Sequence, residues 1–302
     1  MDTIDKGILI DLVRNCRRTY EELSRSHGIS ANAIRKRIIR LEESGVIDKY
    51  TIALSPAMIG SEFAFGLVST DGSRDEEEMI IEIGSNPNVI AAASYTDGTY
   101  DLVGEYTNTN ELMSISTHLR ALQSVEKVVM HTILQDKGGE CELTNLHLRV
   151  LHCLVQDARM SIVDIANQTG LTARRVRRVL QDLEETNSVR ATANLELGAA
   201  SGIPFIVWFS FDERKIGPEE FRVWLWENYS HPLWQVYVSV SEPIVGALFA
   251  VDSLPDLDSL VRAVRSSEYV KTAKVSIGTH HHYFKTPRRR RLEEMVARAF
   301  GE

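Results

Sequence analysis

The sequence predicts an α+β protein built from two tandem copies of one unit, in which three helices precede a βαββαβ domain. Three observations predict this fold class. The chain has 302 residues, room for several compact domains, and 43% of them are hydrophobic. Its second half repeats the pattern of its first half. Stretches with helical spacing of apolar residues also alternate with short apolar runs typical of strands.

The repeat is found by sliding the sequence along itself, which is the first comparison to make because a repeat changes every later assignment. At a shift of 142 positions, from Leu9 to Leu151, the two copies coincide without a gap. The agreement continues as far as Val128 and Val270. We interpret the chain as a duplication with five parts, at residues 1–50, 51–142, 143–192, 193–283 and a basic tail helix at 284–302.

Residues 1–28 have the pattern of two helices. Ile4, Ile8 and Leu12 form the stripe of the first. Thr19 is placed to cap a short second helix, and Gly28 can take the left-handed backbone conformation that a tight turn after it needs.

A third helix is predicted over residues 31–44, with Ser30 as its cap. Apolar side chains at i, i+4 and i+7 face the core; they are Ile34, Ile38 and Leu41. The opposite face is polar and cationic, and carries Asn32, Arg35, Lys36 and Ile39, with Arg40 at its edge.

Beyond residue 50 the predicted order of elements is βαββαβ. Apolar strands are expected at 63–69, 89–95, 102–107 and 125–134, and helices at 76–84 and 110–123. The second copy predicts the same order, and its longest apolar run, 244–251, is too short to cross a bilayer and fits a buried strand.

The run from Leu23 to Ile47, LSRSHGISANAIRKRIIRLEESGVI, resembles the helix-turn-helix of the leucine-responsive, or Lrp/AsnC, regulators. The βαββαβ order resembles the ferredoxin-like effector domain of the same family. The resemblance covers nearly the whole chain twice and stops near Gly278. It implies a sequence-specific regulator of transcription that binds double-stranded DNA, with a three-helix winged helix-turn-helix and a ferredoxin-like domain in each copy. It also implies homo-oligomers, dimers or larger, because chains of the family pair through their effector domains.

A helix that enters the major groove presents short polar and cationic side chains near its N-terminus. Four residues of copy one fit this need: Ser30, Asn32, Arg35 and Lys36. Arginine and lysine suit guanine or phosphate, and asparagine suits adenine. Arg37 and Arg40 are expected to contact phosphate or to pair with Glu42 and Glu43. The alternative for this face is a solvated helix surface in a domain used for dimerisation.

The corresponding face of copy two is richer in arginine. Its candidate residues are Thr172, Arg174, Arg175, Arg177 and Arg178. Four arginines attract phosphate but specify sequence poorly unless each is individually positioned, so we expect degenerate or non-specific binding. Asn187 stands where copy one has Gly45, and asparagine can also take the left-handed conformation after a helix.

An effector site is predicted in copy one only. Four consecutive residues between two predicted strands match the Gly-x-aromatic-Asp turn that lies at the small-molecule site of the family: Gly98, Thr99, Tyr100 and Asp101. The carboxylate of Asp101 suits the ammonium group of an amino acid or amine. The alternative is a plain hairpin turn, because Asp-Gly is common there. Copy two has Val240-Ser241-Glu242-Pro243 in this place and departs from the pattern.

The net charge of −8 is unevenly distributed, and the distribution fits a DNA-binding protein better than the total does. Residues 1–50 hold ten lysines and arginines against eight acidic residues, and residues 144–192 hold seven against five. Residues 51–143 hold four against fifteen. This alternation predicts separate DNA-facing and DNA-avoiding parts.

The three cysteines, Cys16, Cys141 and Cys153, form no CxxC pair, which favours a reducing cytoplasm. We expect neither a secretory leader nor a membrane span, because no apolar run approaches ~18 residues.

No catalytic residue and no cofactor is predicted, since the sequence lacks GxSxG, HExxH and a glycine-rich phosphate loop. The run His280–His282 is not expected to bind a metal, because neighbouring residues of a strand point to opposite faces. Two other functions stay open. One is a tetrapyrrole enzyme with the similar architecture of the sirohaem decarboxylases. The other is a small-molecule sensor or adaptor that does not bind DNA.

Overall fold

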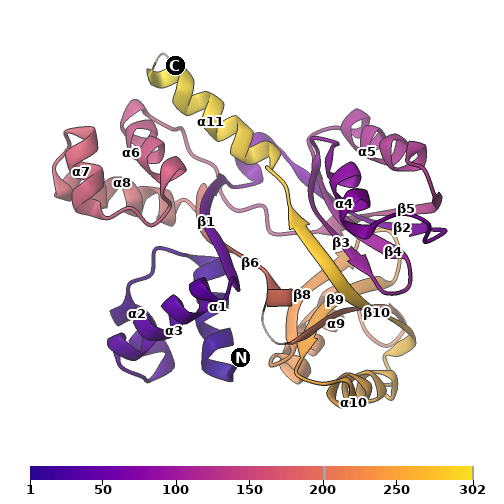
Figure 1. The fold of residues 1–302 in the computed structure, drawn as a ribbon. Helices are drawn as coiled ribbons and strands as arrows, with labels where there is room; N and C mark the ends of the chain where they lie inside the picture. The colour runs from indigo at the N-terminus through magenta and orange to yellow at the C-terminus, as the bar shows by residue number, and fades with distance from the viewer. Residues whose placement is uncertain (200–201, 301–302) are drawn as a thin grey trace. The chain divides into compact units, whose positions relative to one another are not determined.

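The computed structural model describes residues 1–199 and 202–300 and resolves the chain into two compact units, each of which takes residues from both copies. The helical unit consists of Met1–Ser61, Asp136–Glu196 and Lys285–Glu302. The barrel unit consists of Glu62–Gln135 and Leu197–Phe284. Figure 1 labels the elements of both units.

The helical unit contains both predicted three-helix blocks. The helices of the first block are α1 (Thr3–Arg14), α2 (Tyr20–His27) and α3 (Ala31–Glu43). Those of the second block are α6 (Asn145–Gln156), α7 (Ile162–Thr169) and α8 (Ala173–Glu185). Each begins and ends 142 positions after its counterpart, as the repeat predicts.

The signals that begin and end these helices act as predicted. The hydroxyl of Ser30 accepts a hydrogen bond from the backbone N–H of Ala33 at 3.2 Å, and Thr172 caps α8 in the same way. Gly28 has φ 66°, in the left-handed region that a side chain makes costly, and Asn187 has φ 48°. The two blocks therefore have the same local design.

The strands that follow the two blocks pair with each other. β1 (Ile47–Leu54) runs antiparallel to β6 (Val189–Leu195), with Ile52 opposite Ala191. Ile52 and Leu54 are buried among the helices of the second block, so part of the core of copy two comes from copy one. The sequence did not predict this exchange. The short helix η1 (Ala57–Ile59) follows β1.

The last helix, α11 (Pro287–Phe300), belongs to the same core, and its buried Leu292 and Val296 pack there (Figure 1). Arg288 donates to the carbonyl of Leu54 at 3.1 Å, and Arg289 donates to those of Ile52 at 3.0 Å and Val155 at 2.5 Å. The basic tail is therefore a docked element of the unit.

The barrel unit contains two βαββαβ domains, as predicted. The first has β2 (Glu62–Thr70), α4 (Glu76–Gly84), β3 (Val89–Tyr95), β4 (Thr99–Tyr106), α5 (Thr109–Ala121) and β5 (Val125–Leu134). The short helix η2 (Leu197–Ala199) precedes the second, which has β7 (Ile203–Phe211), α9 (Pro218–Tyr229), β8 (Leu233–Ser239), β9 (Ile244–Val251), α10 (Leu254–Arg265) and β10 (Val270–Tyr283).

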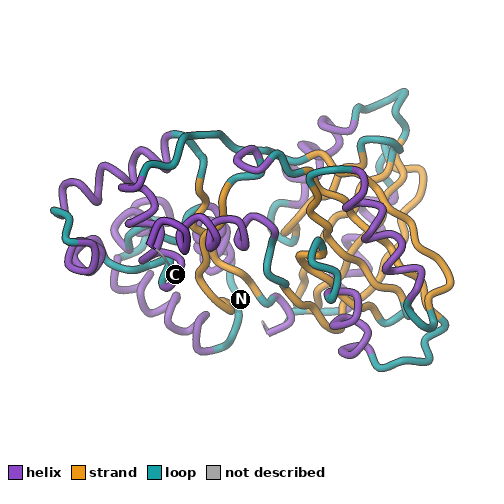
Figure 2. Tube along the Cα trace, turned by 90° about the horizontal axis from the view of Figure 1, so that it is seen from above, coloured by secondary structure: helices purple, strands orange, loops and turns teal. Residues whose placement is uncertain are grey.

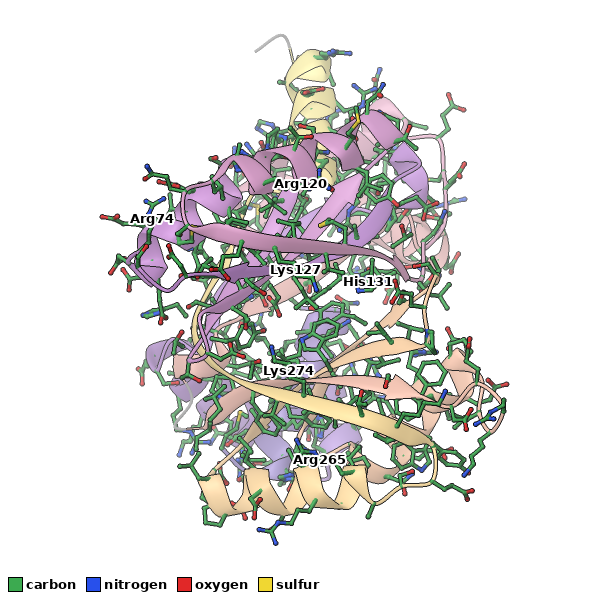
Figure 3. The ribbon with its side chains drawn as sticks, turned by 90° about the vertical axis from the view of Figure 1, so that its right-hand side faces the viewer. Arg74, Arg120, Lys127, His131, Arg265 and Lys274 are labelled. Carbon is green, nitrogen blue, oxygen red and sulfur yellow. The ribbon has the colours of Figure 1, made fainter. Side chains whose placement is uncertain are left out.

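The two sheets join edge to edge into one closed barrel of order β10-β3-β4-β2-β5-β8-β9-β7, whose strands are orange in Figure 2. At one seam Ile133 of β5 lies opposite Ser239 of β8, and at the other His281 of β10 lies opposite Ala93 of β3. Helices cover the outside, as Arg120 on α5 and Arg265 on α10 mark in Figure 3, while side chains of both sheets fill the inside. Closure leaves neither sheet with a free edge.

The copies do not keep one register in the barrel unit. β2 and β7 begin 141 positions apart, at Glu62 and Ile203, whereas β4 and β9 begin 145 apart, at Thr99 and Ile244. The prediction of an ungapped repeat is therefore wrong beyond the helical blocks. Relative to copy one, copy two loses one residue before β7 and gains four between β7 and β9.

A slip of one residue reverses the face to which a strand side chain points. Phe65 accordingly lies between the two sheets, while Val207, 142 positions later, packs under the helices of its own domain. By the register of the strands, Gly246 corresponds to Asp101. Copy two therefore lacks a carboxylate at this place, in agreement with the departure predicted from its turn.

Candidate nucleic-acid interface and effector turn

The candidate recognition helix of copy one, α3, has one buried face and one exposed face. Ile34, Ile38 and Leu41 are buried in the unit, as their spacing predicts. Asn32, Arg35 and Lys36 are exposed on the opposite face, close to the capped N-terminus. Within residues 1–199 and 202–300, no side chain holds the cationic ends of Arg35 and Lys36 in an ion pair or hydrogen bond. Both cations are available to an external anion.

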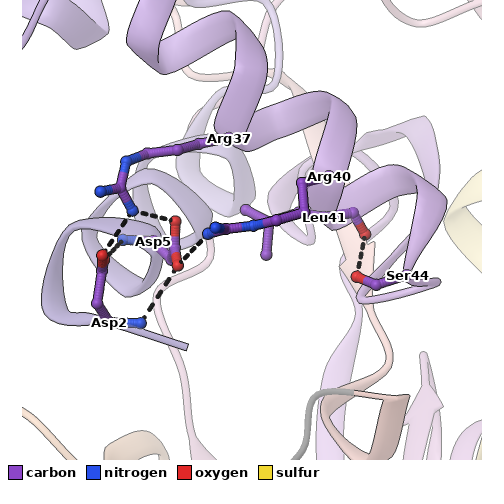
Figure 4. Close-up of polar contacts among 6 residues, drawn as sticks. All are labelled: Asp2, Asp5, Arg37, Arg40, Leu41 and Ser44. Carbon is purple, nitrogen blue, oxygen red and sulfur yellow. Dashed lines mark hydrogen bonds and ion pairs between the residues drawn. The ribbon is translucent and has the colours of Figure 1, made fainter.

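Arg37 and Arg40 have a different environment, because both are bound to the start of α1 (Figure 4). Arg37 Nη1 lies 2.7 Å from Asp2 Oδ2 and 2.7 Å from Asp5 Oδ1. Arg40 Nη2 lies 2.6 Å from Asp5 Oδ2. The prediction that these arginines pair with Glu42 or Glu43 is wrong: those carboxylates follow on the last turn of α3, whereas α1 packs alongside that helix.

The electrostatics of Asp2 and Arg37 agree with this geometry. The backbone N–H of Asp5 and the Arg37 guanidinium hold the pKa of Asp2 below its usual value. The hydrogen bonds to Asp5 and Asp2 raise the pKa of Arg37. Both groups are therefore charged at every physiological pH.

The candidate recognition helix of copy two, α8, buries Val176, Val179 and Leu183. Its four arginines are all exposed, and none has an ion pair or side-chain hydrogen bond to another described residue; they are Arg174, Arg175, Arg177 and Arg178. α8 thus presents more unpaired positive charge than α3 does. The two helices therefore differ in how many exposed cations they offer to an anion.

Two matching arginines that the DNA prediction did not include bind the three-helix blocks to each other. Arg17 donates to the carbonyls of Ala158 at 2.7 Å and Met160 at 2.9 Å in the other block. Its counterpart Arg159 donates to the hydroxyl of Tyr50 on β1 at 3.0 Å and pairs with Glu42 on α3 at 3.9 Å. A signal for them exists in the sequence, because an arginine recurs at the same place between the first two helices of each copy.

The predicted effector turn is a tight hairpin whose aspartate points inward. Gly98 has φ 72°, and Asp97 beside it accepts a hydrogen bond from Ser276 Oγ at 2.8 Å and pairs with Lys274 Nζ at 3.6 Å. Thr99 begins β4, so Thr99, Tyr100 and Asp101 lie within the strand and not in the turn as predicted.

The carboxyl of Asp101 is 8% exposed and accepts a hydrogen bond from the hydroxyl of Tyr95 inside the barrel. Burial raises its pKa to about 6, although the Tyr95 hydroxyl and nearby His281 act in the opposite direction. Tyr100 points the other way, into the core under the helices. The turn therefore does not present the carboxylate to solvent.

The histidine run lies on β10, where neighbouring side chains alternate as predicted. His280 Nδ1 lies 3.1 Å from Glu76 Oε2, which also accepts from Ser94 Oγ at 3.0 Å and Thr279 Oγ1 at 2.5 Å. This cluster ties the N-terminus of α4 to β10. Among the described residues, no group of three or more histidine, cysteine, aspartate or glutamate side chains is placed to hold a metal ion.

The described part of the chain contains no helix long and apolar enough to span a membrane. Its three cysteines form no disulfide, and Cys16 and Cys153 are buried.

Comparison with protein families finds a match in each helical block. Residues 1–42 match the AsnC-type helix-turn-helix domain, and residues 143–189 match a winged helix-turn-helix DNA-binding family. A solved structure with the same tandem organisation, siroheme decarboxylase NirDL, superposes on 99% of this chain and 100% of its own with a TM-score of 0.57. At 14% identity it shows a common fold and no more.

Relatives of known family match one copy at a time. The HTH-type transcriptional regulator FL11 of Pyrococcus horikoshii is 30% identical over 146 residues, which are 47% of this chain and 95% of that protein. The regulatory protein AsnC of Escherichia coli is 29% identical over 103 residues, 34% of this chain and 67% of AsnC. The chain therefore belongs to the Lrp/AsnC family, in a form that carries the family's helix-turn-helix and effector domain twice.

Proposed function

We propose that this protein is a DNA-binding transcriptional regulator in which one chain supplies both recognition helices. The observation that carries the proposal is the charge of α3 and α8. Each helix is capped at its N-terminus and turns unpaired cations outward, while its apolar side chains are buried. Both helices belong to one compact unit, as two recognition helices on a common DNA site require.

The two helices have different roles in this proposal. On α3, Asn32, Arg35 and Lys36 read base edges, because a short cluster at the N-terminal end reaches into the major groove. On α8, four arginines bind phosphate and contribute affinity without selecting a sequence. The half-sites of the operator are then not equivalent.

The effector remains part of the proposal in a restricted form. A small molecule at the Asp97-Gly98 turn would meet the Lys274 ammonium, since Asp101 is inside the barrel and the backbone N–H groups of Gly98 and Thr99 already donate to Tyr95 and Asp97. A carboxylate-bearing ligand such as an amino acid fits that chemistry. One ligand per chain is expected, because copy two has Pro243 in the corresponding turn and departs from the pattern of copy one.

Selection of bound fragments from sheared genomic DNA tests the regulatory function. Enrichment of a limited set of fragments, lost when Arg35 is changed to alanine, is the expected result. Uniform recovery of all fragments would leave only non-specific binding. A protein that retards no fragment at low salt would be a DNA-free sensor or adaptor.

A tetrapyrrole enzyme is the alternative, because the full-length fold is common to this chain and a siroheme decarboxylase. Purified protein mixed with haem precursors distinguishes the two functions. A shifted Soret band followed by loss of carboxyl groups would favour the enzyme, and an unchanged spectrum would favour the regulator.

A further inference from the structure

The acidic start of α1 holds the two inner arginines of α3 in a fixed geometry (Figure 4). Asp5 is almost fully buried, and its two carboxylate oxygens have separate partners: Oδ1 accepts from Arg37 at 2.7 Å and Oδ2 from Arg40 at 2.6 Å. Asp2 adds a second acceptor for Arg37 at 2.7 Å. Two carboxylates thus neutralise two guanidinium groups on the candidate recognition helix.

The carboxylates are held in place before any ligand arrives. Asp2 and Asp5 form a capping box in which each side chain accepts from the backbone N–H of the other, at 2.8 and 3.2 Å. Arg40 is nonetheless 61% exposed along its side chain. A DNA phosphate could reach it, but would have to displace a carboxylate that already makes a charge-assisted hydrogen bond.

Copy two has none of these four charged groups in this arrangement. At the shift of 142 that holds for the helical blocks, Thr144 and His147 replace Asp2 and Asp5, and Val179 and Asp182 replace Arg37 and Arg40. The four arginines of α8 occupy other positions and have no such acceptor among the described residues. The arrangement is therefore a property of copy one alone.

We infer that Asp2 and Asp5 limit the sequence-independent affinity of the protein for DNA, because they occupy Arg37 and Arg40 in the manner of phosphate and withhold them from the DNA backbone. This inference rests on the proposed DNA-binding function. Fewer free cations lower the affinity of α3 for every sequence equally, whereas the base contacts of Asn32, Arg35 and Lys36 are unaffected. The ratio of specific to non-specific affinity is therefore unchanged, and the two aspartates lower how tightly the protein holds DNA of any sequence.

The test is the salt dependence of binding to a duplex of unrelated sequence, measured for the full chain. Asp5→Asn releases Arg40 and weakens the hold on Arg37. We expect the slope of log K against log salt to steepen by about one unit, and by about two in the Asp2→Asn/Asp5→Asn double variant, because each new phosphate contact adds about 0.9. Binding at 0.1 M salt should tighten by roughly five- to tenfold in the single variant.

Glu43→Gln is the matched control. It also removes one negative charge, from α3 instead of α1, and Glu43 is exposed without an ion pair to any described residue. It should tighten binding slightly through the general field and leave the slope unchanged. If Asp5→Asn behaves like Glu43→Gln, Asp5 acts only through its charge and the inference is wrong.

A second measurement is needed because Asp5 is buried and its replacement could unfold α1. Thermal unfolding of each variant shows whether α1 remains folded. The Arg37→Gln/Arg40→Gln variant then shows, without a change at Asp5, whether the two arginines contribute to DNA binding. That variant should leave the salt slope for unrelated DNA unchanged, with slightly weaker binding through the general field, and combined with Asp5→Asn it should show no gain in slope. A loss of affinity as large as that of Arg177→Ala would mean that Arg37 and Arg40 already contact DNA.

The outcomes separate the inference from the proposed function. Wild-type protein that binds no duplex at low salt contradicts the proposed function. In that case a gain of duplex binding in the Asp2→Asn/Asp5→Asn variant would still support the withholding of the arginines, and no gain would contradict it.

Discussion

Arg35 and Arg37 lie two positions apart on α3 and have opposite environments. Arg35 is exposed and unpaired among the described residues, whereas Arg37 is bound by two aspartates. We predict that Arg35→Ala costs about 1–3 kcal/mol of binding free energy at the preferred operator and relaxes the base preference there. Arg177→Ala on α8 should weaken binding to all sequences alike and reduce the salt slope by about one unit. Titration of the selected operator and of an unrelated duplex measures both. Equal loss of specificity in the two variants would contradict the division of roles.

The burial of Asp101 predicts that the stability of the fold depends on pH. The pKa of Asp101 is about 6 in the fold against an ordinary value of 3.8, because it is buried. Below about pH 4 the carboxyl is protonated in the folded and the unfolded chain alike. Between about pH 4 and pH 6 the unfolded chain ionises first, so the folded state loses stability as the pH rises, by about 3 kcal/mol in all. Asp101→Asn keeps the acceptor for Tyr95 and removes the charge. We therefore expect this variant to match the wild type near pH 4 and to be more stable at pH 8.

Urea unfolding at the two pH values measures this difference. Asp258→Asn is the control, since Asp258 is an exposed partner of Arg262 on α10 and should show no such dependence. A variant less stable than the wild type at pH 8 would mean that ionised Asp101 has a stabilising partner in the barrel. Loss of amino-acid binding in Asp101→Asn, without loss of stability, would restore Asp101 as a ligand residue.

At the level of residues, sequence patterns predicted the cap and the exposed face of a helix. They did not predict the contacts between one helix and another. The caps at Ser30 and Thr172 and the exposed face of α3 depend on local spacing, and they are confirmed. The partners of Arg37 depend on how α1 packs against α3. No pattern within either helix contains that information, and nothing in the spacing of Asp2 and Asp5 marks them as partners of Arg37 and Arg40.

Among the elements, α11 makes the clearest stability prediction. Leu292 is fully buried in the core of the second block, and Arg289 donates to carbonyls of β1 and α6. Leu292→Ala should lower the free energy of unfolding by about 2–4 kcal/mol, the usual cost of a cavity. Phe300→Ala, at the exposed end of the helix, should change it little. Chemical denaturation monitored by circular dichroism compares them. Equal small effects would mean that α11 is not needed for the core.

The periodicity of the sequence predicted the positions of the helices and strands closely. It did not predict the offset between corresponding strands of the two copies. β3, α4 and β5 have the predicted bounds, because apolar alternation defines a strand by its own residues. The sequence did not reveal the gain of four residues between β7 and β9, because the ungapped alignment also places apolar residues opposite apolar residues. The starts of β4 and β9 reveal it, and the opposite orientations of Phe65 and Val207 reveal the loss of one residue before β7.

The whole molecule depends on two seams, β5 with β8 and β10 with β3. A fragment of residues 1–142 retains β3 and β5 without their partners. Two free edges favour pairing with a second fragment, so we expect this fragment to self-associate at micromolar concentration. Sedimentation velocity measures this, with the full chain as reference. A stable monomer would contradict the view that the seams replace the contact between identical chains.

The tandem organisation was predicted from the sequence, whereas the division into units was not. The repeat suggests copies that fold side by side. The structure instead groups helical parts with helical parts and sheets with sheets, because β1 pairs with β6 and the two sheets close on each other. Such pairings join residues far apart in the chain and leave no local pattern.

The closed barrel also affects how the protein behaves in a cell that contains other regulators of its kind. Regulators that assemble from separate subunits can exchange them with paralogues, and dilution takes them apart. Here both partners of each seam are synthesised on one polypeptide, so their stoichiometry is one to one at any level of expression. A substitution on α8 is always inherited together with α3. Selection can therefore change the two helices as one asymmetric pair, in which neither helix is exchanged for that of a paralogous subunit.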